Sequence, residues 1–535
     1  MYDIIIINGT ILDGTGRKMF TGDVGIQGGK IRTIGYLRHE SARQTLDAGG
    51  CFVTPGFVDI TNHSDTYWQL FAKNGLESLL QQGVTTIVGG NSGSSLAPFT
   101  NQRMLETIQK WVDIRGLNLN WLSMHEFLDE VERRHLPMNF ATLTGHATLR
   151  RGVLRDIARQ LEPNEIKILQ KMLQESFAEG SFGLSLGLSY SHAREATRPE
   201  LATLMEATKR ANGLCSIHLR NESEEVIEAV EEAILLAQSS GVRTHISHLK
   251  VLNEANWPSF EKIVYLLETA ASSGTNISFD VYPYTSTASV LYTLLPDWVT
   301  QGGKKMMLSR LKEPKLRAEV IAEMKKRQLD YTKATLLASS LNTMTHRQNV
   351  AEMAREQRKS PEEILLDLLV AGSGRAIISL ETLSEENIVR AIQHPLSCVS
   401  SNGFGLAKED AESGEATHPR NFGAFPKFLG QYVREQQLLG WEEAIRKITY
   451  QPATRLGLQK RGSLAEGNWA DVVIFDPERI VDMSTFARPY QYPKGIRWVV
   501  VNGEVAVAEG IMTSERVGQA LRREGPKWWQ YSGVM

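Results

Sequence analysis

Short apolar runs alternate with stretches of helical periodicity through the middle of the chain. The first run, Phe57–Ile60, follows a Pro-Gly turn and is followed by polar side chains from Thr61 to Asp65. A buried strand that ends in polar residues is typical of an α/β barrel, whose active site forms at the carboxyl ends of the strands. The pattern occurs eight times, the number of strands that closes such a barrel. The predicted strands are 57–61, 84–89, 138–143, 181–186, 214–218, 243–248, 277–281 and 397–401.

Segments with apolar residues at helical spacing lie between these strands, which indicates βα units and a parallel sheet. The distance between the seventh and eighth strands is too long for one helix. We therefore expect residues 285–375 to form an inserted subdomain or lid with a strand at 334–338, and the barrel to comprise 55–284 and 376–460. The predicted barrel helices are 101–114, 163–179, 222–240 and 257–273.

Both ends of the chain contain short strand-like segments separated by turn residues. The N-terminal strands are expected at 2–8, 22–28, 31–35 and 44–48, and the C-terminal ones at 470–476, 496–501 and 504–508. Neither group completes a domain alone, so we expect 1–54 and 465–510 to form one β-sandwich beside the barrel, followed by a tail at 511–535. The predicted class is α/β: a TIM-like (β/α)8 barrel with a small β-sandwich from both termini and an insertion before the last barrel strand.

Composition adds limits on the cellular context. Apolar residues make up 42% of the chain and charged residues 22%, as in globular proteins with a large core. The net charge of −2 favours neither nucleic acid nor an anionic membrane as a partner. The 3 cysteines form no spacing pattern, and no apolar run approaches ~20 residues. We expect the N-terminal residues to form a strand rather than a signal peptide. We expect a cytoplasmic protein that acts on a small molecule; the sequence leaves open whether it forms a homo-oligomer.

Polar side chains at the predicted strand ends are candidates for chemistry. His63, His218 and His248 come from three strand ends and could bind one zinc ion with a water as fourth ligand. Taken singly, each histidine is better explained by ordinary hydrogen bonds at the barrel rim; together they favour a shared site. The other strand-end candidates are Thr61, Asp65, Asn91, Ser92, His146, Lys250, Asp280, Tyr282, Tyr284 and Asn402.

Several of these residues have two interpretations. Lys250 follows His248 by two positions and could hold a substrate carboxylate, or be a solvated rim lysine. Arg420, in the sequence His-Pro-Arg, could be an anion clamp or a surface residue at a helix start. One of Tyr282 and Tyr284 is expected to line the pocket and the other to lie in the core. His245 should point to the opposite face from His248 and be structural.

Many short motifs then occur in a characteristic order. They are PGFVD at 55–59, GVTTIVGGNSGSSLAP at 83–98, GHATLR at 145–150, GLSLGLSY at 183–190, HLRNE at 218–222, ISHLK at 246–250, DVYPY at 280–284, SNGFG at 401–405 and HPR at 418–420. Over nearly its whole length the chain resembles the D-aminoacylase (N-acyl-D-amino-acid deacylase) family of the amidohydrolase superfamily. The resemblance implies the fold described above, zinc-dependent amide hydrolysis, and acyl amino acid contacts from Lys250, Tyr190, Tyr282 and Arg420.

The resemblance fails at three positions of the metal centre. Thr61 stands where the family has the first histidine of a His-x-His pair, and threonine is a poor zinc ligand. Ser92 replaces a metal-binding cysteine, and its hydroxyl stays protonated where a thiolate would bind. Asn402 replaces the catalytic aspartate and cannot accept a proton from a metal-bound water.

Three hypotheses follow. The first is a hydrolase of amide C–N bonds with one zinc or other divalent metal at His63, His218 and His248, and Asp65 as the only nearby carboxylate base. The second is a catalytically inactive protein that binds an N-acyl amino acid or similar carboxylate. The third is metal-free catalysis with Ser92 as nucleophile, His63 as base and Asp65 as the orienting acid. We favour the first because the remaining pocket residues resemble those of a deacylase.

Overall fold

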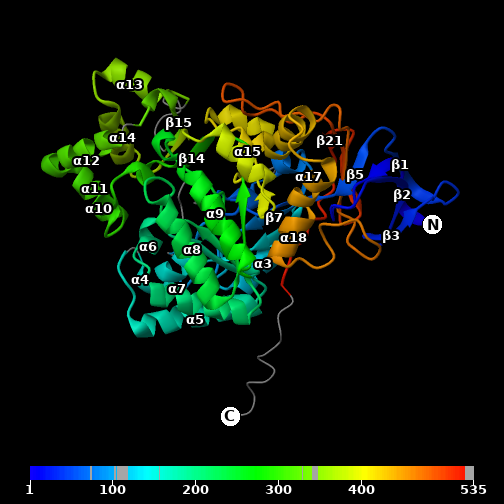
Figure 1. The fold of residues 1–535 in the computed structure, drawn as a ribbon, viewed down its shortest axis with the longest axis horizontal. Helices are drawn as coiled ribbons and strands as arrows, with labels where there is room; N and C mark the ends of the chain where they lie inside the picture. Colours follow the sequence, from blue (N-terminus) through cyan, green and yellow to red (C-terminus); the bar gives the residue numbers. More distant parts are fainter. Residues whose placement is uncertain are drawn as a thin grey trace, which may run out of the picture.

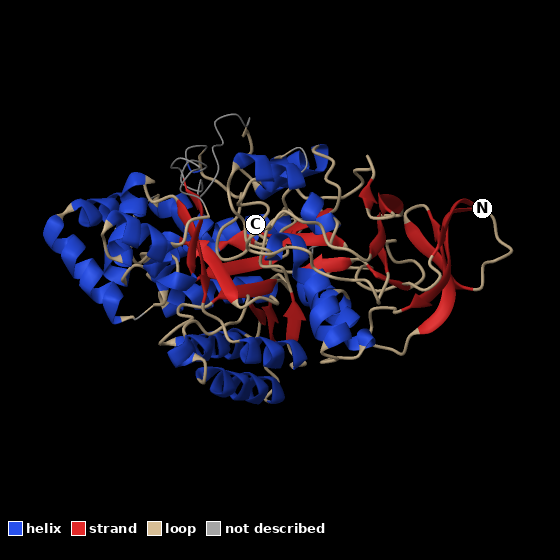
Figure 2. Ribbon diagram, turned by 90° about the horizontal axis from the view of Figure 1, so that it is seen from above, coloured by secondary structure: helices blue, strands red, loops and turns tan. Residues whose placement is uncertain are grey.

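The computed structural model describes residues 1–72, 75–101, 104, 119–155, 157–327, 329–339 and 347–523. A strand-rich domain carrying the N-terminus lies at one end of the molecule, the barrel lies in the middle, and a mostly helical segment lies at the other end (Figures 1 and 2). The helix predicted at 101–114 lies outside the described residues except for Asn101 and Met104.

The barrel strands form at all eight predicted places, in two parallel sheets of order β6-β7-β8 and β17-β13-β12-β11-β10-β9. Strands β8 and β9 follow each other through Leu143, whose backbone N–H donates to Gly89 O at 3.0 Å and so connects the two sheets. At the opposite side, Asn62 forms a parallel bridge with Gly403. The strands are β6 (Phe57–Asp59), β7 (Val84–Gly89), β8 (Asn139–Thr142), β9 (Thr144–Gly145), β10 (Gly183–Gly187), β11 (Leu214–His218), β12 (Arg243–Ile246), β13 (Ile277–Val281) and β17 (Ser397–Val399).

Amphipathic helices cover the outside of the barrel. In α5 (Pro163–Ala178) a proline in the first turn and a Glu162–Glu165 capping box begin the helix, and Leu169, Leu173 and Phe177 face the core. The helix predicted from residue 222 begins only at Val226, so 219–225 form a loop after β11. The remaining barrel helices are α1 (Glu77–Leu80), α3 (Met124–Arg133), α4 (His146–Leu154), α6 (Ser191–Arg194), α7 (Arg198–Arg210), α8 (Val226–Ser240), α9 (Ser259–Ser272), α15 (Glu385–Gln393), α16 (Arg420–Lys427), α17 (Trp441–Ile448) and α18 (Tyr450–Leu456).

The segment between β13 and β17 has an antiparallel sheet of its own, with strand order β14-β16-β15. These strands are β14 (Ser286–Val290), β15 (Ala334–Ser339), which includes the strand predicted at 334–338, and β16 (Ala376–Glu381). Because β16 pairs with both other strands, the insertion continues beyond the boundary expected at 375. A separate apolar cluster forms its core. Its helices are α10 (Asp297–Thr300), α11 (Lys304–Lys312), α12 (Pro314–Lys326), α13 (Val350–Gln357) and α14 (Pro361–Ala371).

Both chain ends contribute to one nine-stranded sheet, of order β21-β20-β19-β18-β5-β1-β2-β3 with β4 beside β1. The antiparallel pair β5–β18 joins the two ends, and residues such as Ile4, Val24, Ile474 and Trp498 share one apolar cluster. The strands are β1 (Tyr2–Ile11), β2 (Phe20–Gln27), β3 (Lys30–Gly35), β4 (Ala42–Asp47), β5 (Phe52–Pro55), β18 (Val472–Phe475), β19 (Ile496–Val501), β20 (Glu504–Ala508) and β21 (Ile511–Met512).

The C-terminal segment also takes part in the fold. Strand β21 pairs with β20, so the terminal sheet extends beyond its expected end at residue 510. Further on, Phe140 N–H donates to Gln519 O at 2.9 Å and Leu521 N–H donates to Phe140 O at 2.7 Å, so this segment lies alongside β8. Within the described residues, no helix combines the length and apolar character needed to cross a membrane.

Candidate active site

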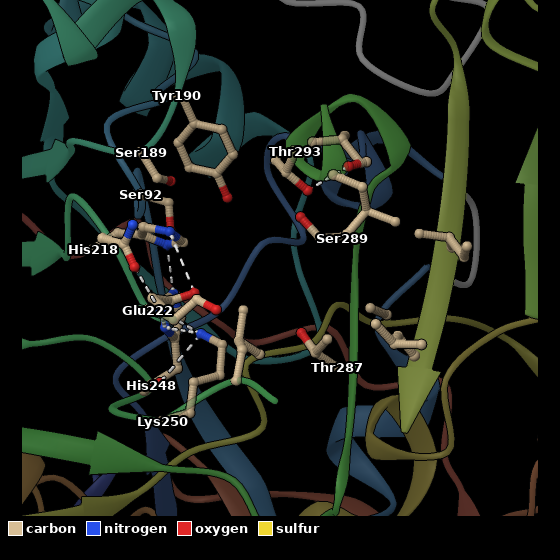
Figure 3. Close-up of a pocket in the computed structure, with 18 of the residues that line it drawn as sticks. Ser92, Ser189, Tyr190, His218, Glu222, His248, Lys250, Thr287, Ser289 and Thr293 are labelled. Carbon is tan, nitrogen blue, oxygen red and sulfur yellow. Dashed lines mark hydrogen bonds and ion pairs between the residues drawn. The ribbon is translucent and has the colours of Figure 1, made fainter. Parts of the chain in front are cut away.

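A cavity of about 210 Å³ lies at the carboxyl ends of the barrel strands, beneath the insertion. The insertion contributes residues of β14 and β16 to one wall, and the ion pair between Arg194 of α6 and Asp297 of α10 links it to the barrel across the cavity. The other walls are polar and come from the loops that follow the barrel strands (Figure 3). Of the predicted candidates, the cavity is lined by His63, Asn91, Ser92, Tyr190, His218, His248, Lys250, Asn402 and Arg420.

Two imidazoles and one carboxylate form a compact group on the cavity wall. The distance between His218 Nδ1 and His248 Nε2 is 2.9 Å. Glu222 Oε1 lies 3.3 Å from His248 Nδ1, and Glu222 Oε2 lies 3.8 Å from His218 Nε2. The potential ligand atoms of His218, Glu222 and His248 all lie within 4.8 Å of one another. Among the described residues, these three form the group that could hold a metal ion.

His63 lies outside that group. Its Nε2–H donates to Asn402 Oδ1 at 3.0 Å, so it lines the same cavity with a different partner. The compact group thus contains two of the three predicted imidazoles together with a carboxylate that was not predicted, and His63 faces Asn402 in the same cavity. β6 ends at Asp59 and His63 follows an isolated bridge at Asn62, so the alternation of a strand does not fix the direction of its ring.

Burial determines the protonation of the two paired imidazoles. Burial lowers the pKa of His248 and takes the pKa of His218 well below its ordinary value, so both rings are neutral near pH 7. His248 Nδ1 has a donor and an acceptor close by: Lys250 Nζ lies at 2.9 Å and Glu222 Oε1 at 3.3 Å.

Lys250 also contacts the Glu222 carboxylate through Nζ and Oε1. Burial opposes ionisation of this carboxyl group, but the positive charge of the Lys250 ammonium outweighs it and holds the pKa of Glu222 far below its usual range. The pair is almost completely enclosed, with side-chain exposures of 8% for Lys250 and 10% for Glu222. The cavity wall thus contains a buried ion pair beside two neutral imidazoles.

Three residues of the site adopt left-handed backbone conformations directly after their strands. The φ angles are 52° at Ser92, 41° at His248 and 46° at Asn402. Such conformations cost a non-glycine residue free energy and occur where the surrounding structure fixes a side-chain direction. The Ser92 hydroxyl is buried, and no hydrogen-bond partner for it occurs within the described residues. It lies beside His218 in Figure 3.

Arg420 supplies a second cation to the cavity. Only 6% of the residue is exposed, and burial lowers the pKa of its guanidinium. Nη2 donates to Ala288 O at 3.3 Å, while Nε and Nη1 are buried without a hydrogen-bond partner in the part of the chain that the structure describes. The guanidinium lies 5.1 Å from the ring centre of Tyr282, which supports it from behind the cavity wall.

Other predicted candidates lie away from the cavity. Tyr282 does not line it, and Tyr284 instead donates its hydroxyl to Asp482 Oδ2 at 2.7 Å. Asp65 is completely buried and accepts a hydrogen bond from Gly90 N–H at 2.7 Å, so it is displaced from the position of a catalytic base. His146, the first residue of α4, lies 2.7 Å from a carboxylate oxygen of Glu200 in the interior.

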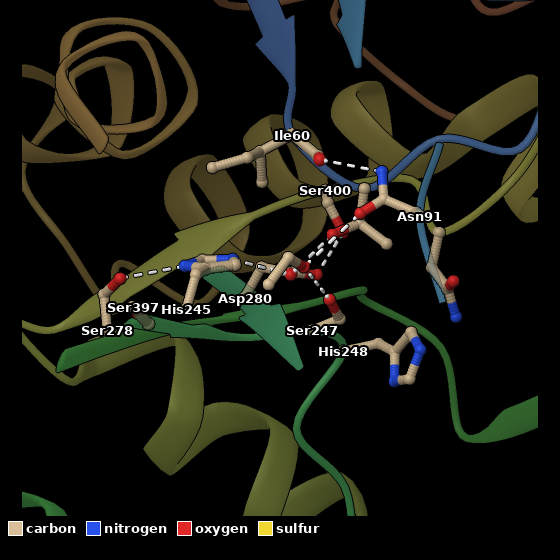
Figure 4. A network of polar contacts seen from close by, with 12 residues as sticks. Ile60, Asn91, His245, Ser247, His248, Ser278, Asp280, Ser397 and Ser400 are labelled. Atoms are coloured by element: carbon tan, nitrogen blue, oxygen red, sulfur yellow. Dashed lines mark hydrogen bonds and ion pairs between the residues drawn. The ribbon is translucent and has the colours of Figure 1, made fainter. Parts of the chain in front are cut away.

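A buried polar network lies beneath the cavity and is organised by Asp280 (Figure 4). Asp280 accepts hydrogen bonds from Thr61 Oγ1 at 2.7 Å, Ser400 Oγ at 2.5 Å and His245 Nε2 at 2.8 Å. Burial opposes ionisation of Asp280, but its hydrogen bonds outweigh burial and hold the pKa of Asp280 below its usual value, the bond from His245 having the largest effect among them. His245 is thus structural, as the sequence indicates, and Thr61 is a partner of Asp280.

Glu222 is the residue of the site that the sequence analysis missed. It lies in the motif HLRNE, four positions after His218, but was assigned to the start of a helix. The available signal was a carboxylate four positions after a strand-end histidine, since His and Glu together are zinc ligands in catalytic sites.

Paired imidazoles and two cations in a cavity at the carboxyl ends of a parallel barrel are typical of an α/β-barrel enzyme. The profile of the amidohydrolase family matches residues 44–507, and the chain belongs to that family.

Individual relatives match over nearly their whole lengths. The chain is 30% identical to D-aminoacylase of Alcaligenes xylosoxydans xylosoxydans over 522 residues, which covers 98% of each protein. It is 31% identical to N-acyl-D-glutamate deacylase of the same organism, over 98% of this chain and 97% of the relative. A crystal structure of N-acyl-D-glutamate deacylase from Bordetella bronchiseptica, complexed with zinc and a phosphonate inhibitor, superposes with a TM-score of 0.83 at 29% identity, covering 98% of this chain and all of that chain.

Proposed function

We propose that this protein hydrolyses the amide bond of N-acyl amino acids with the help of one divalent metal ion. The observation that carries the proposal is that one cavity contains both the His218–His248 pair and a buried arginine with two unpartnered N–H groups. The first can hold a metal ion, and the second can hold a carboxylate. The similarity to deacylases that act on N-acyl amino acids supports this combination.

The residues present fit a single ion. Neutral imidazoles are the form that binds metals, and His218 Nδ1 and His248 Nε2 lie 2.9 Å apart beside the orphaned hydroxyl of Ser92. His218 and His248 would hold the ion, and zinc is the metal bound in the related crystal structure. When bound, such an ion polarises a carbonyl group and lowers the pKa of a water ligand.

Arg420 and Lys250 would orient the substrate. Nε and Nη1 of Arg420 form a planar fork that matches the two oxygens of a carboxylate. With the carboxylate held at Arg420, the scissile amide of an N-acyl α-amino acid would lie a few bonds away, in the cavity that the imidazole pair also lines. Tyr190 adds a neutral phenol to the same wall, because burial raises its pKa.

The Asn402 side chain cannot accept a proton from the attacking water, so another residue must act as the general base. Glu222 is a poor acceptor, because its neighbours keep its pKa low. His63 lines the cavity and is held in orientation by the bond from Nε2 to Asn402. Imidazole is the most frequent general base in enzymes, so we assign proton transfer to His63.

A substrate panel tests this function. Protein reconstituted separately with zinc, cobalt or manganese is incubated with N-acetyl amino acids of both chiralities, and the released amine is measured by fluorescent derivatisation. We expect release from at least one free carboxylate substrate and none from the matching carboxamide. Absence of release from every substrate with every metal would refute the hydrolase proposal.

A second candidate is a binding protein without turnover, and the replacement of the family aspartate by Asn402 favours it. In that case N-acyl amino acids would raise the melting temperature by binding to the folded state while the amine assay stays blank. The same purified sample distinguishes the two functions.

A further inference from the structure

Glu222 places a carboxylate against the two imidazoles without a role in the function proposed above. Its oxygens lie 3.3 Å from His248 Nδ1 and 3.8 Å from His218 Nε2. Nitrogen atoms of two histidines and an oxygen of one carboxylate form a common protein ligand set for catalytic divalent ions. Ser92, with its neutral hydroxyl, offers no comparable anionic ligand.

The Lys250 ammonium is already a cationic partner of this carboxylate. Nζ contacts Glu222 Oε1, lies 2.9 Å from His248 Nδ1 and donates to His248 O at 3.4 Å. A protein-borne cation is therefore bound by two of the groups that a metal ion would use (Figure 3). A divalent ion bound to the same carboxylate would repel the ammonium at this short distance.

We propose that Glu222 is the third protein ligand of the metal ion, together with His218 and His248, and that the ion and Lys250 compete for this carboxylate. The inference rests on the proposed metal-dependent function and deepens it. When the ion binds, Lys250 is released from Glu222 and becomes free to hold the substrate carboxylate beside Arg420. Metal binding would thereby prepare the substrate site, and the ion would bind before the substrate.

Charge provides the reason for this order. With Lys250 paired to Glu222, Arg420 is left as the predicted substrate contact that can hold a carboxylate. With the ion on Glu222, two side-chain cations and the ion face the substrate. The ligand set also predicts that ions which accept imidazole and carboxylate ligands, such as zinc, cobalt and manganese, bind in preference to copper(I), which prefers thiolates.

Metal affinity, measured without any activity readout, tests the proposal. Metal-free full-length protein is titrated with cobalt and with zinc against a chromogenic chelator, and bound metal is counted after gel filtration. We compare wild type with Glu222→Gln, Lys250→Met and the double variant. Glu224→Gln is the matched control, because Glu224 lines the same cavity from the same loop but is exposed and lies outside the ligand group.

We expect Glu222→Gln to weaken affinity by at least tenfold, Lys250→Met to tighten it by about tenfold, and Glu224→Gln to leave it within twofold. If wild type binds the ion and Glu222→Gln binds it with the same affinity, this inference is overturned while the metal-dependent function stays intact. No wild-type binding of any ion would overturn both. If Glu222→Gln loses its cooperative thermal unfolding, Lys250→Met decides: unchanged affinity in that variant refutes the competition.

Discussion

Replacement of Arg420 is the sharpest test of carboxylate recognition. Arg420→Met keeps a long side chain but removes the cation and both unpartnered donors, Nε and Nη1. A hydrogen bond to a charged group contributes about 1.5–3 kcal/mol, so two such bonds to a bound carboxylate correspond to about 3–6 kcal/mol. At about 1.4 kcal/mol per factor of ten, kcat/KM should fall by roughly 10²- to 10⁴-fold.

The assay compares two substrates in three proteins. Initial rates are measured with an N-acyl amino acid and with its carboxamide, in wild type, Arg420→Met and Arg420→Lys. Wild type should prefer the carboxylate strongly, and Arg420→Met should show no preference. Arg420→Lys should be intermediate, because it keeps the charge but not the planar fork.

Folding stability serves as the control for this variant. Nε and Nη1 of the buried Arg420 have no hydrogen-bond partner within the described residues, and Arg420→Met loses the 3.3 Å bond from Nη2 to Ala288 O. Replacing such a buried cation with an apolar side chain should leave the melting temperature unchanged or raise it. If the carboxylate preference survives in Arg420→Met, the assignment of Arg420 is wrong. A loss of rate accompanied by unfolding would be inconsistent with the predicted stability.

Three further predictions concern buried groups. Thr61→Val removes the 2.7 Å bond to Asp280 and should lower the free energy of unfolding by about 1–3 kcal/mol in urea titrations; an unchanged midpoint contradicts this. Burial raises the pKa of Asp59 to about 7, so the folded state binds its proton more tightly than the unfolded state. This contribution to stability is complete below about pH 4 and is lost up to pH 7, at about 1.4 kcal/mol per pH unit; Asp59→Asn should lack this slope in pH-dependent unfolding, and a parallel curve refutes the assignment. Glu200→Gln leaves Arg150 buried without its carboxylate and should cost about 3–5 kcal/mol by chemical denaturation, and a cost below about 1 kcal/mol would contradict it.

The barrel was predictable from sequence because each strand is short, apolar and bounded by turn residues. Strands 214–218 and 277–281 match the structure residue for residue. Parallel barrel strands bring their carboxyl ends to one side, so it was also predictable that polar residues at the strand ends would lie near one another. His218 and His248 meet there as expected.

Side-chain directions beyond the strands were not predictable. Alternation holds only inside a strand, and β6 ends at Asp59, so it gave no information on Asp65. His146 likewise begins a helix and points to an interior glutamate. The helical periodicity of 226–240 was extended too far toward the N-terminus, which concealed Glu222 in a loop. Left-handed backbone at Ser92 also leaves no sequence signature in a non-glycine residue.

Amide hydrolysis in the His218–His248 cavity is tested most directly by following both products in one NMR tube. Zinc-reconstituted protein is mixed with the best N-acetyl amino acid of the panel, and acetate and free amino acid are counted over time. We predict their appearance in equal amounts with wild type and none with the His218→Asn/His248→Asn double variant. No products from wild type, or equal rates from the folded double variant, would contradict hydrolysis at this site.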